Sequence, residues 1–240
     1  MPEIIKNKEI LDDVKIFFEK QSVYKKIVDH DYTGHKEIYQ QIHNFIKENF
    51  KQDFSLLDLG CGNSAYIAKA LKNTQIKSYL GIDLSPLSLQ LAKENIKPLN
   101  CKANFLAENF SSFIENTTET FDIIFMGLSL HHLFFNQKEK FLIKLHSLIT
   151  KAGVIIVFDT FLNENESRAD YLVRWHNLCY NSWVKLTSEE KKSIEDHVTK
   201  SDYPETFSTL QIMGQKAGFK KTEVIMQKIK EKYGLVIFYK

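Results

Sequence analysis

Two short segments combine glycines and acidic residues in a way that could bind a ligand. The first, Leu56-Leu57-Asp58-Leu59-Gly60-Cys61-Gly62-Asn63-Ser64, is a hydrophobic run that ends in two closely spaced glycines. Glycine accepts left-handed backbone torsions, and it lets a ligand lie against the main chain at the start of the next helix. The second segment, Gly81-Ile82-Asp83, ends 21 residues after Gly62. A carboxylate there can accept hydrogen bonds from both hydroxyls of a ribose, so the two segments predict a nucleoside site.

Two kinds of nucleotide ligand fit this spacing. Gly60-x-Gly62-x-x-Ala65 satisfies the dinucleotide fingerprint, which tolerates alanine at its third position. Asp58 argues against a dinucleotide, because its charge would repel a pyrophosphate and attract the ammonium group of an amino acid. A nucleoside that carries an amino-acid moiety therefore fits better, and an NAD-dependent oxidoreductase stays open as the alternative.

The elements that must position these residues alternate along the chain. Short hydrophobic runs predict strands at 55–59, 78–82, 103–107, 121–126 and 154–159. Amphipathic segments such as 65–71 and 138–149 predict helices between them. Two last strands, 221–229 and 235–239, are joined too closely to be parallel. We expect an α/β fold: a Rossmann-like three-layer sandwich with a mostly parallel seven-stranded sheet and an antiparallel C-terminal hairpin.

Helical segments are added to this alternation in two places. In the first fifty residues, apolar side chains recur at three- and four-residue intervals, at Ile10, Leu11, Val14, Phe17 and Phe18 and again at Ile38, Ile42, Phe45 and Ile46. After Asp159 the chain becomes polar, aromatic and helical until the last two strands. We expect an N-terminal helical cap over 1–50 and a main domain over 51–240, with a helical substrate-cap insertion over 160–217.

Several segments resemble, in order, the motifs of class I S-adenosylmethionine-dependent methyltransferases. Leu57-Asp58-Leu59-Gly60-Cys61-Gly62 resembles their first motif, and Gly81-Ile82-Asp83-Leu84-Ser85 resembles the second. Leu106-Ala107-Glu108-Asn109-Phe110 lies where the family places an acidic residue near the adenine. The resemblance covers roughly residues 54–160 and the closing hairpin. It implies an enzyme that binds S-adenosylmethionine through His35, Asp58, Gly60, Cys61, Gly62, Asp83, Leu84, Glu108, Asn109 and Gly127.

The architecture is also similar to that of the carboxy-S-adenosylmethionine synthases, which have two N-terminal helices and a comparable insertion. Where they carry Pro-Gly-Tyr, this chain has Thr33-Gly34-His35, and we expect His35 to reach the methionyl end of the ligand. The arginine expected after the long insertion helix is missing from Tyr180-Asn181-Ser182-Trp183. Without the planar guanidinium group of that arginine, which could bind a carboxylate through two hydrogen bonds, the site is poorly suited to recognise an extra carboxylate. We therefore expect a shared architecture with a different reaction.

Two histidines follow the fourth strand in Ser129-Leu130-His131-His132-Leu133. His131 and His132 are candidate catalytic residues, because an imidazole near the methyl group could take a proton from an incoming oxygen or nitrogen. A helix cap, a core position or a solvent-facing position is the alternative for each. Methyl transfer also proceeds without a base, where the nucleophile is held in line and water is excluded.

The composition limits the expected partners. The 32 basic and 30 acidic residues nearly cancel, and only Arg168 and Arg174 of the basic set are arginines, so a nucleic-acid partner is not supported. Three widely spaced cysteines form no disulfide framework, and no apolar run reaches membrane-spanning length. We therefore expect a cytoplasmic protein without a membrane partner. The spacing of His and Cys fits no metal motif, and we expect no metal.

These observations predict a methyltransferase that acts on an oxygen or nitrogen atom of a small molecule. An S-adenosylmethionine-binding protein or a modified-cofactor synthase without ordinary methyl transfer stays open as an alternative. A homodimer also stays open, since the insertion carries aromatic residues that could wall the acceptor, pack on the sheet or cover a partner subunit. These residues are Tyr171, Trp175, His176, Tyr180 and Trp183.

Overall fold

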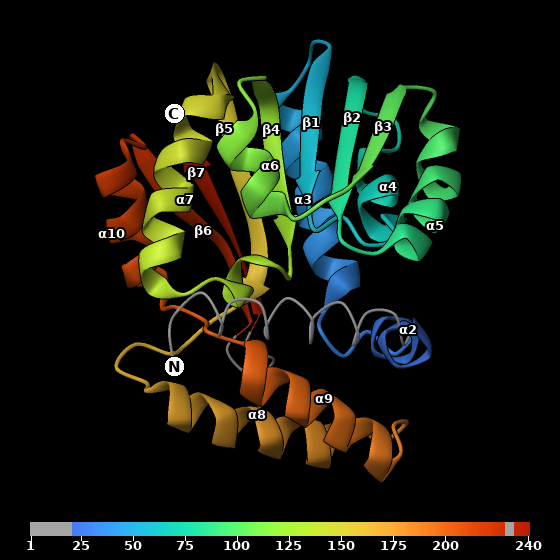
Figure 1. Ribbon diagram of the computed structural model, residues 1–240, viewed down its shortest axis with the longest axis vertical. Coiled ribbons are helices and arrows are strands. Elements are labelled where there is room, and N and C mark those ends of the chain that lie inside the picture. Colours follow the sequence, from blue (N-terminus) through green and yellow to red (C-terminus); the bar gives the residue numbers. More distant parts are fainter. Residues whose placement is uncertain (1–20, 229–232) are drawn as a thin grey trace.

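A seven-stranded sheet forms the centre of the computed structural model, which describes residues 21–228 and 233–240 (Figure 1). Its strands are β1 (Phe54–Leu59), β2 (Ile76–Asp83), β3 (Lys102–Ala107), β4 (Phe121–Gly127), β5 (Ile149–Thr160), β6 (Lys221–Lys228) and β7 (Tyr233–Tyr239). They lie in the order β3-β2-β1-β4-β5-β7-β6, in which β1 to β5 are parallel and β7 is antiparallel to both neighbours. The expected fold class is confirmed.

The central strands are buried on both faces, which explains their continuous hydrophobic sequences. Leu56 and Leu57 of β1 point to opposite faces, and each is at most 1% exposed. The edge strand β3 is far less buried. Chain order reverses between β1 and β4, which is where sheets of this kind leave a crevice at the carboxyl ends of the strands.

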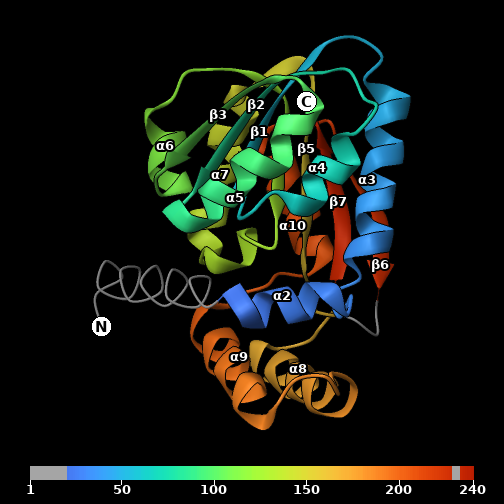
Figure 2. The same cartoon turned by 90° about the vertical axis from the view of Figure 1, so that its right-hand side faces the viewer.

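Helices cover both faces of the sheet (Figure 2). One face carries α3 (His35–Asn49), α4 (Ala65–Leu71) and α5 (Pro86–Ile96), and the other carries α6 (Phe110–Asn116), α7 (Phe135–Leu148) and α10 (Phe207–Ala217). Ser85 caps α5 by accepting a hydrogen bond from the Ser88 N–H, with Pro86 at the first helical position, where proline fits well. None of the helices in the described part of the chain is both long and apolar enough to cross a bilayer.

A separate group of helices lies beyond the carboxyl ends of the parallel strands (Figures 1 and 2). It contains α2 (Gln21–Asp29), α8 (Arg168–Ser182) and α9 (Ser188–Ser201), and we call it the cap. The cap has its own hydrophobic core, formed by Val23, Ile27, Tyr171, Trp175, Cys179, Trp183, Leu186, Ile194 and Val198. Lys26 pairs with Glu190 at 2.6 Å, and the ring of Tyr32 stacks on that of Trp183 at 5.1 Å. The N-terminal segment and the insertion thus fold together.

Each of the two helical regions expected from the sequence contains one helix that packs on the main sheet domain and not in the cap. α3 lies within the expected cap over 1–50, yet Ile38, Ile42 and Ile46 are fully buried against the sheet. α10 lies within the expected insertion over 160–217, yet it packs on α7 and β6. The helix expected around Ile10 to Phe18 lies outside the described residues. The domain boundaries themselves stay predictions.

The cap core predicts a specific loss of stability. Trp175 is 3% exposed within it, so Trp175→Ala should lower the free energy of unfolding by about 3–5 kcal/mol. Val173 lies on the same helix but is 62% exposed, and Val173→Ala should change it by no more than about 0.5 kcal/mol. Urea unfolding followed by circular dichroism measures both. Equal effects of the two substitutions would mean that the cap has no core of its own.

Candidate functional site

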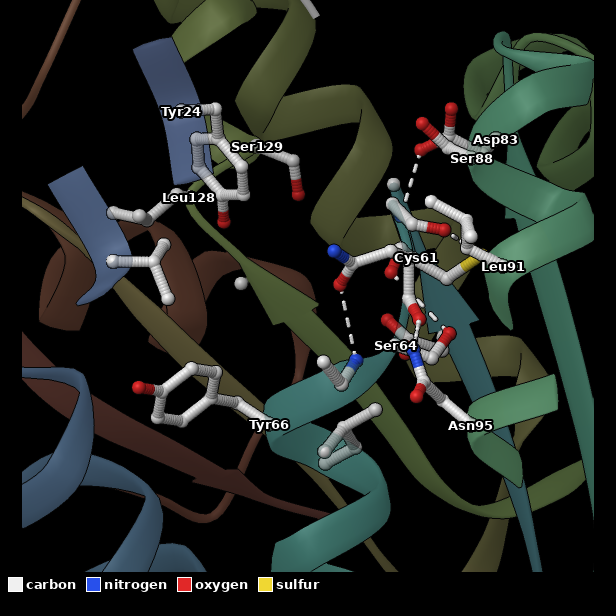
Figure 3. A pocket seen from close by; sticks show the side chains of 18 of the residues that line it. Tyr24, Cys61, Ser64, Tyr66, Asp83, Ser88, Leu91, Asn95, Leu128 and Ser129 are labelled. Carbon is white, nitrogen blue, oxygen red and sulfur yellow. Dashed lines mark hydrogen bonds between the residues drawn. The ribbon is translucent and has the colours of Figure 1, made fainter. Parts of the chain in front are cut away.

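A cavity of about 520 Å³ lies at the carboxyl edge of the sheet, within the size range of small-molecule sites. β1, β2 and β4 end in it, and α2, α3 and α4 complete its wall. Figure 3 shows Tyr24, Tyr66 and Leu128 on one side, with Cys61, Asp83 and Leu91 on the other. Nine of the ten predicted cofactor residues line it, namely His35, Asp58, Gly60, Cys61, Gly62, Asp83, Leu84, Glu108 and Gly127.

The turn after β1 forms the floor of the cavity. Gly60 has a φ of 75°, and a Cβ atom there would lie 2.9 Å from Cβ of Ser129, so no side chain fits. Gly62 has a φ of 50°, but a Cβ atom there would meet open space. The first glycine is thus required by protein packing, whereas the second leaves bare backbone that faces room for a ligand.

The Asp83 carboxylate joins this turn to the end of β2. Its Oδ2 accepts a hydrogen bond of 2.8 Å from the Gly62 N–H, and its Oδ1 accepts one of 2.8 Å from the Ser85 N–H. Burial raises the pKa of Asp83, although the backbone N–H groups of Ser85, Gly62 and Leu84 act against that shift. Each carboxylate oxygen keeps a second lone pair, with which it can accept a ribose hydroxyl.

Two of the predicted cofactor residues, Glu108 and Asn109, follow β3 and have different roles. Glu108 lines the cavity, and its N–H donates a hydrogen bond of 3.1 Å to the carbonyl of Asp83. Asn109 is not among the lining residues. Its Oδ1 caps α6 by accepting hydrogen bonds from the N–H groups of Ser111 and Ser112 at 2.8 and 3.1 Å. A contact of Asn109 with the cofactor stays a prediction.

Asp58 is the most unusual acid of the site, because it is only 1% exposed. Its Oδ2 accepts a hydrogen bond of 2.6 Å from the Tyr79 hydroxyl. Burial raises the pKa of Asp58 to about 7; the hydrogen bond from Tyr79 lowers the pKa, and the charge of Asp83 raises it further. A ligand ammonium group near Asp58 would favour the ionised carboxylate.

The opposite wall contains three tyrosine rings that no sequence motif indicated, beside the predicted His35. Tyr24 comes from α2, Tyr39 from α3 and Tyr66 from α4, and the His35 ring packs 4.9 Å from that of Tyr66. Burial lowers the pKa of His35 to about 4 and raises the pKa of Tyr24 to about 12. These side chains are therefore neutral near pH 7, although α2 and α4 also bring the charged side chains of Lys25, Asp29 and Lys69 to the lining.

The two candidate catalytic histidines lie in different places. His132 lines the cavity, with its Nδ1 3.1 Å from the carbonyl of Ser201. His131 is outside the cavity, where its Nδ1 hydrogen-bonds Asp159. Burial lowers the pKa of His131, but Asp159 and Asp202 outweigh it and the net shift is upward. Burial, with His131 and His197, holds the pKa of His132 well below its ordinary value. Catalysis by either stays a prediction.

Among the described residues that line the cavity there is no arginine. Arg168 donates hydrogen bonds to the carbonyls of Asp202 and Thr199 at 2.7 and 2.6 Å. Arg174 forms an ion pair with Glu166 and donates to the carbonyl of Phe161. Both guanidinium groups thus bond to the cap helices or to the segments that connect the cap to the sheet, and not to the cavity.

Comparisons with known proteins point to one family. The methyltransferase domain family matches residues 50–209. Carboxy-S-adenosyl-L-methionine synthase 1 of Yersinia pseudotuberculosis is 25% identical over 181 residues, which are 72% of this chain and 74% of that protein. Carboxy-S-adenosyl-L-methionine synthase of Nautilia profundicola is 19% identical, with 95% of each chain covered.

Solved structures share the fold at low sequence identity. The plantazolicin methyltransferase BpumL in complex with SAH has a TM-score of 0.62 at 14% identity, covering 98% of this chain and 99% of that one. A putative O-methyltransferase from Nostoc punctiforme has a TM-score of 0.59 at 18% identity. That comparison covers 84% of this chain and 55% of the other, so the present chain spans about half the length of the Nostoc protein.

Asp83 provides a direct test of the nucleoside site. Asp83→Asn should weaken the binding of S-adenosylhomocysteine about 10- to 100-fold in calorimetry, because charge-assisted hydrogen bonds to the ribose are lost. Asp122→Asn is the matched control, since that carboxylate bonds Ser55 and Thr150 at the opposite end of the strands. It should leave the affinity unchanged. Equal losses in both variants would indicate damage to the fold instead of loss of a ligand contact.

Asp58 predicts how binding depends on pH. With its pKa near 7, the affinity for S-adenosylhomocysteine should rise as pH increases through about 7, because only the carboxylate attracts the ligand ammonium group. Calorimetry across that range should give a flat profile for Asp58→Asn.

The same shift determines the sign of the pH effect on stability. Between pH 3.8, the ordinary pKa of an aspartate side chain, and about pH 7, the folded, ligand-free protein keeps a proton on Asp58 that the unfolded chain has lost. The contribution of Asp58 to the free energy of unfolding should therefore fall as pH rises through that range. A pH profile of stability that is identical in the wild type and Asp58→Asn would contradict the assignment.

Proposed function

Since this chain belongs to the methyltransferase domain family, we propose that it transfers a methyl group to an oxygen or nitrogen atom of an uncharged small molecule. The enzyme uses S-adenosylmethionine as its cofactor. The observation that carries the proposal is one continuous cavity that runs from the Gly62 and Asp83 floor to the tyrosine wall beneath α2.

Three acidic residues of the lining would each bind a different part of the cofactor. Asp83 would accept hydrogen bonds from the ribose hydroxyls, Glu108 would face the adenine, and Asp58 would face the ammonium group. No other protein atom lies within 4 Å of the place where a Cβ atom of Gly62 would be. This open space lets a ligand approach the backbone closely. When bound, S-adenosylmethionine supplies an activated methyl group on its sulfonium.

The remaining wall would select and orient the acceptor. Tyr24, Tyr39 and Tyr66 offer hydroxyl groups on flat apolar rings, and the buried His35 is neutral. Such a surface suits a neutral molecule with an apolar body and few polar atoms. α2 of the cap contributes Tyr24 and Val28 to the cavity wall, and these side chains would exclude water while the nucleophile is held in line. As the acceptor bonds to the methyl carbon and S-adenosylhomocysteine leaves, the proton of the acceptor's O–H or N–H group would pass to His132, which lines the cavity, or to water.

A modified-cofactor synthase is the second candidate, because two relatives of that name align with most of the chain. Recognition of an added carboxylate calls for a cation, and arginine is the residue best suited to it. The lining residues include Lys25 and Lys69 but no arginine, and Asp29, Asp58, Asp83 and Glu108 make the lining acidic. This balance favours ordinary methyl transfer.

Product analysis separates the two candidates. Incubation with methyl-labelled S-adenosylmethionine and a small-molecule extract should transfer label to one extract component and form an equal amount of S-adenosylhomocysteine. Asp83→Asn should reduce the turnover at limiting cofactor, and the control Asp122→Asn should not. Mass spectrometry that finds a carboxylated cofactor and no methylated acceptor would contradict the proposal. Binding of NAD in place of S-adenosylhomocysteine would contradict the cofactor as well.

A further inference from the structure

A second cluster of polar side chains lies where the cap meets the edge of the sheet. His131 and His132 belong to η2 (Leu130–His132), a short helix after β4, and Asp202 directly follows α9 in the cap. Each of the three offers one nitrogen or oxygen atom, and these atoms all lie within 4.8 Å of one another. The cluster therefore joins two parts of the chain that are 70 positions apart in sequence.

Two of these side chains have buried atoms without a hydrogen-bond partner. Within residues 21–228 and 233–240, only three buried side-chain nitrogen or oxygen atoms make no hydrogen bond, and two of them are His132 Nε2 and Asp202 Oδ1. Asp202 is 4% exposed. Leaving a buried polar atom unpaired costs about 1–3 kcal/mol, and more for a charged group. The unpaired Asp202 Oδ1 indicates a partner that is not part of the protein, whereas the unpaired nitrogen of His132 is Nε2 and not the Nδ1 that lies near Asp202.

Asp159 orients the first histidine for ligation. The His131 Nδ1–H donates to Asp159 Oδ1, and the His131 backbone N–H donates to Asp159 Oδ2 at 3.0 Å. With the proton held at Nδ1, the lone pair lies at Nε2, which faces Asp202. Metal-binding histidines commonly show this arrangement, with a carboxylate behind the ring.

The spacing of the atoms suits a small ion. His131 Nε2 lies 3.5 Å from Asp202 Oδ1, and His132 Nδ1 lies 3.9 Å from the same oxygen. Ligands that surround zinc tetrahedrally at about 2.0–2.2 Å are about 3.4 Å apart. Ion binding would thus require Asp202 Oδ1 and the two histidine nitrogens to approach each other by up to about half an ångström, and the cluster as a whole, whose ligand atoms lie within 4.8 Å of one another, would contract around the ion. His132 Nδ1 would exchange its contact with the Ser201 carbonyl for the ion.

The charges of the cluster suit a divalent cation. Asp159 and Asp202 are two nearly buried carboxylates, and the buried Lys138 is already paired with Glu205 at 2.8 Å. A cation of charge +2 would balance the charge of the two carboxylates. Two nitrogen ligands and one oxygen ligand favour a first-row transition metal over magnesium or calcium.

We propose that His131 Nε2, His132 Nδ1 and Asp202 Oδ1 bind a divalent transition metal ion, with zinc as the best fit. Three protein ligands leave one coordination position open, and His132 lines the main cavity. The ion would link Asp202 at the end of α9 to the two histidines that follow β4. The sequence analysis expects no metal, because Asp202 is remote in sequence and the two adjacent histidines fit no metal motif. The site does not depend on the proposed methyl transfer.

Zinc binding to the full-length protein tests the proposal. After treatment with a chelator, the protein should bind one zinc ion per chain, and zinc should raise the thermal midpoint of unfolding. Asp202→Asn removes a ligand and should abolish this binding. Asp159→Asn removes only the carboxylate behind His131 and should weaken the affinity for zinc about 10- to 100-fold. Zinc binding below one ion per chain in the wild type would overturn the proposal.

An exposed pair on the cap provides the matched control. His176 Nδ1 lies 2.8 Å from Glu195 Oε1, and the two side chains are 46% and 25% exposed. His176→Gln should retain full zinc binding, and loss there with retention in Asp202→Asn would overturn the proposal. Anomalous scattering at the zinc edge from wild-type crystals places the ion without any substitution, and an ion elsewhere would also overturn it. Calorimetry with S-adenosylhomocysteine should show unchanged affinity in Asp202→Asn, which keeps this test independent of the cofactor.

Discussion

The hydrogen bond from the Gly62 N–H to the Asp83 carboxylate is the interaction on which the site depends. It connects the turn after β1 to the end of β2, and the N–H groups of Gly60 and Cys61 strengthen the connection by donating to the carbonyl of Ile82. The parallel pairing of the two strands brings these groups together. The turn is therefore rigid before a ligand arrives, so little conformational entropy is lost when the nucleoside binds.

The cap adds specificity to a cofactor site that the sheet edge forms. One side of α2 buries Val23 and Ile27 in the cap core, while Tyr24 and Val28 of the same helix line the cavity. Stability of the cap and the shape of the acceptor wall are therefore coupled through one short helix. The cluster of His131, His132 and Asp202 lies at another contact between the cap and the sheet edge.

Much of the fold could be predicted from the sequence, because its signals are local. The hydrophobic runs of β1 to β5, the Ser85-Pro86 helix start and the left-handed Gly218 at the end of α10 depend on neighbouring residues alone. The floor of the cofactor cavity could also be predicted, because the spacing of Gly60, Gly62 and Asp83 can be read directly from the sequence. The tyrosine wall, the pairing of α2 with α8 and α9, and the histidine–aspartate cluster depend on contacts between distant segments. Amphipathic periodicity shows that such a helix has a buried face, but not against which partner.

A crystal structure of the complex with S-adenosylhomocysteine tests the central claim most directly. The account predicts the ribose hydroxyls within hydrogen-bonding distance of the Asp83 carboxylate, the amino group beside Asp58, and the sulfur facing the wall of Tyr24, Tyr39 and Tyr66. A ligand bound with its adenosine against the tyrosine wall and its amino-acid end at Asp83, or bound outside this cavity, would contradict it.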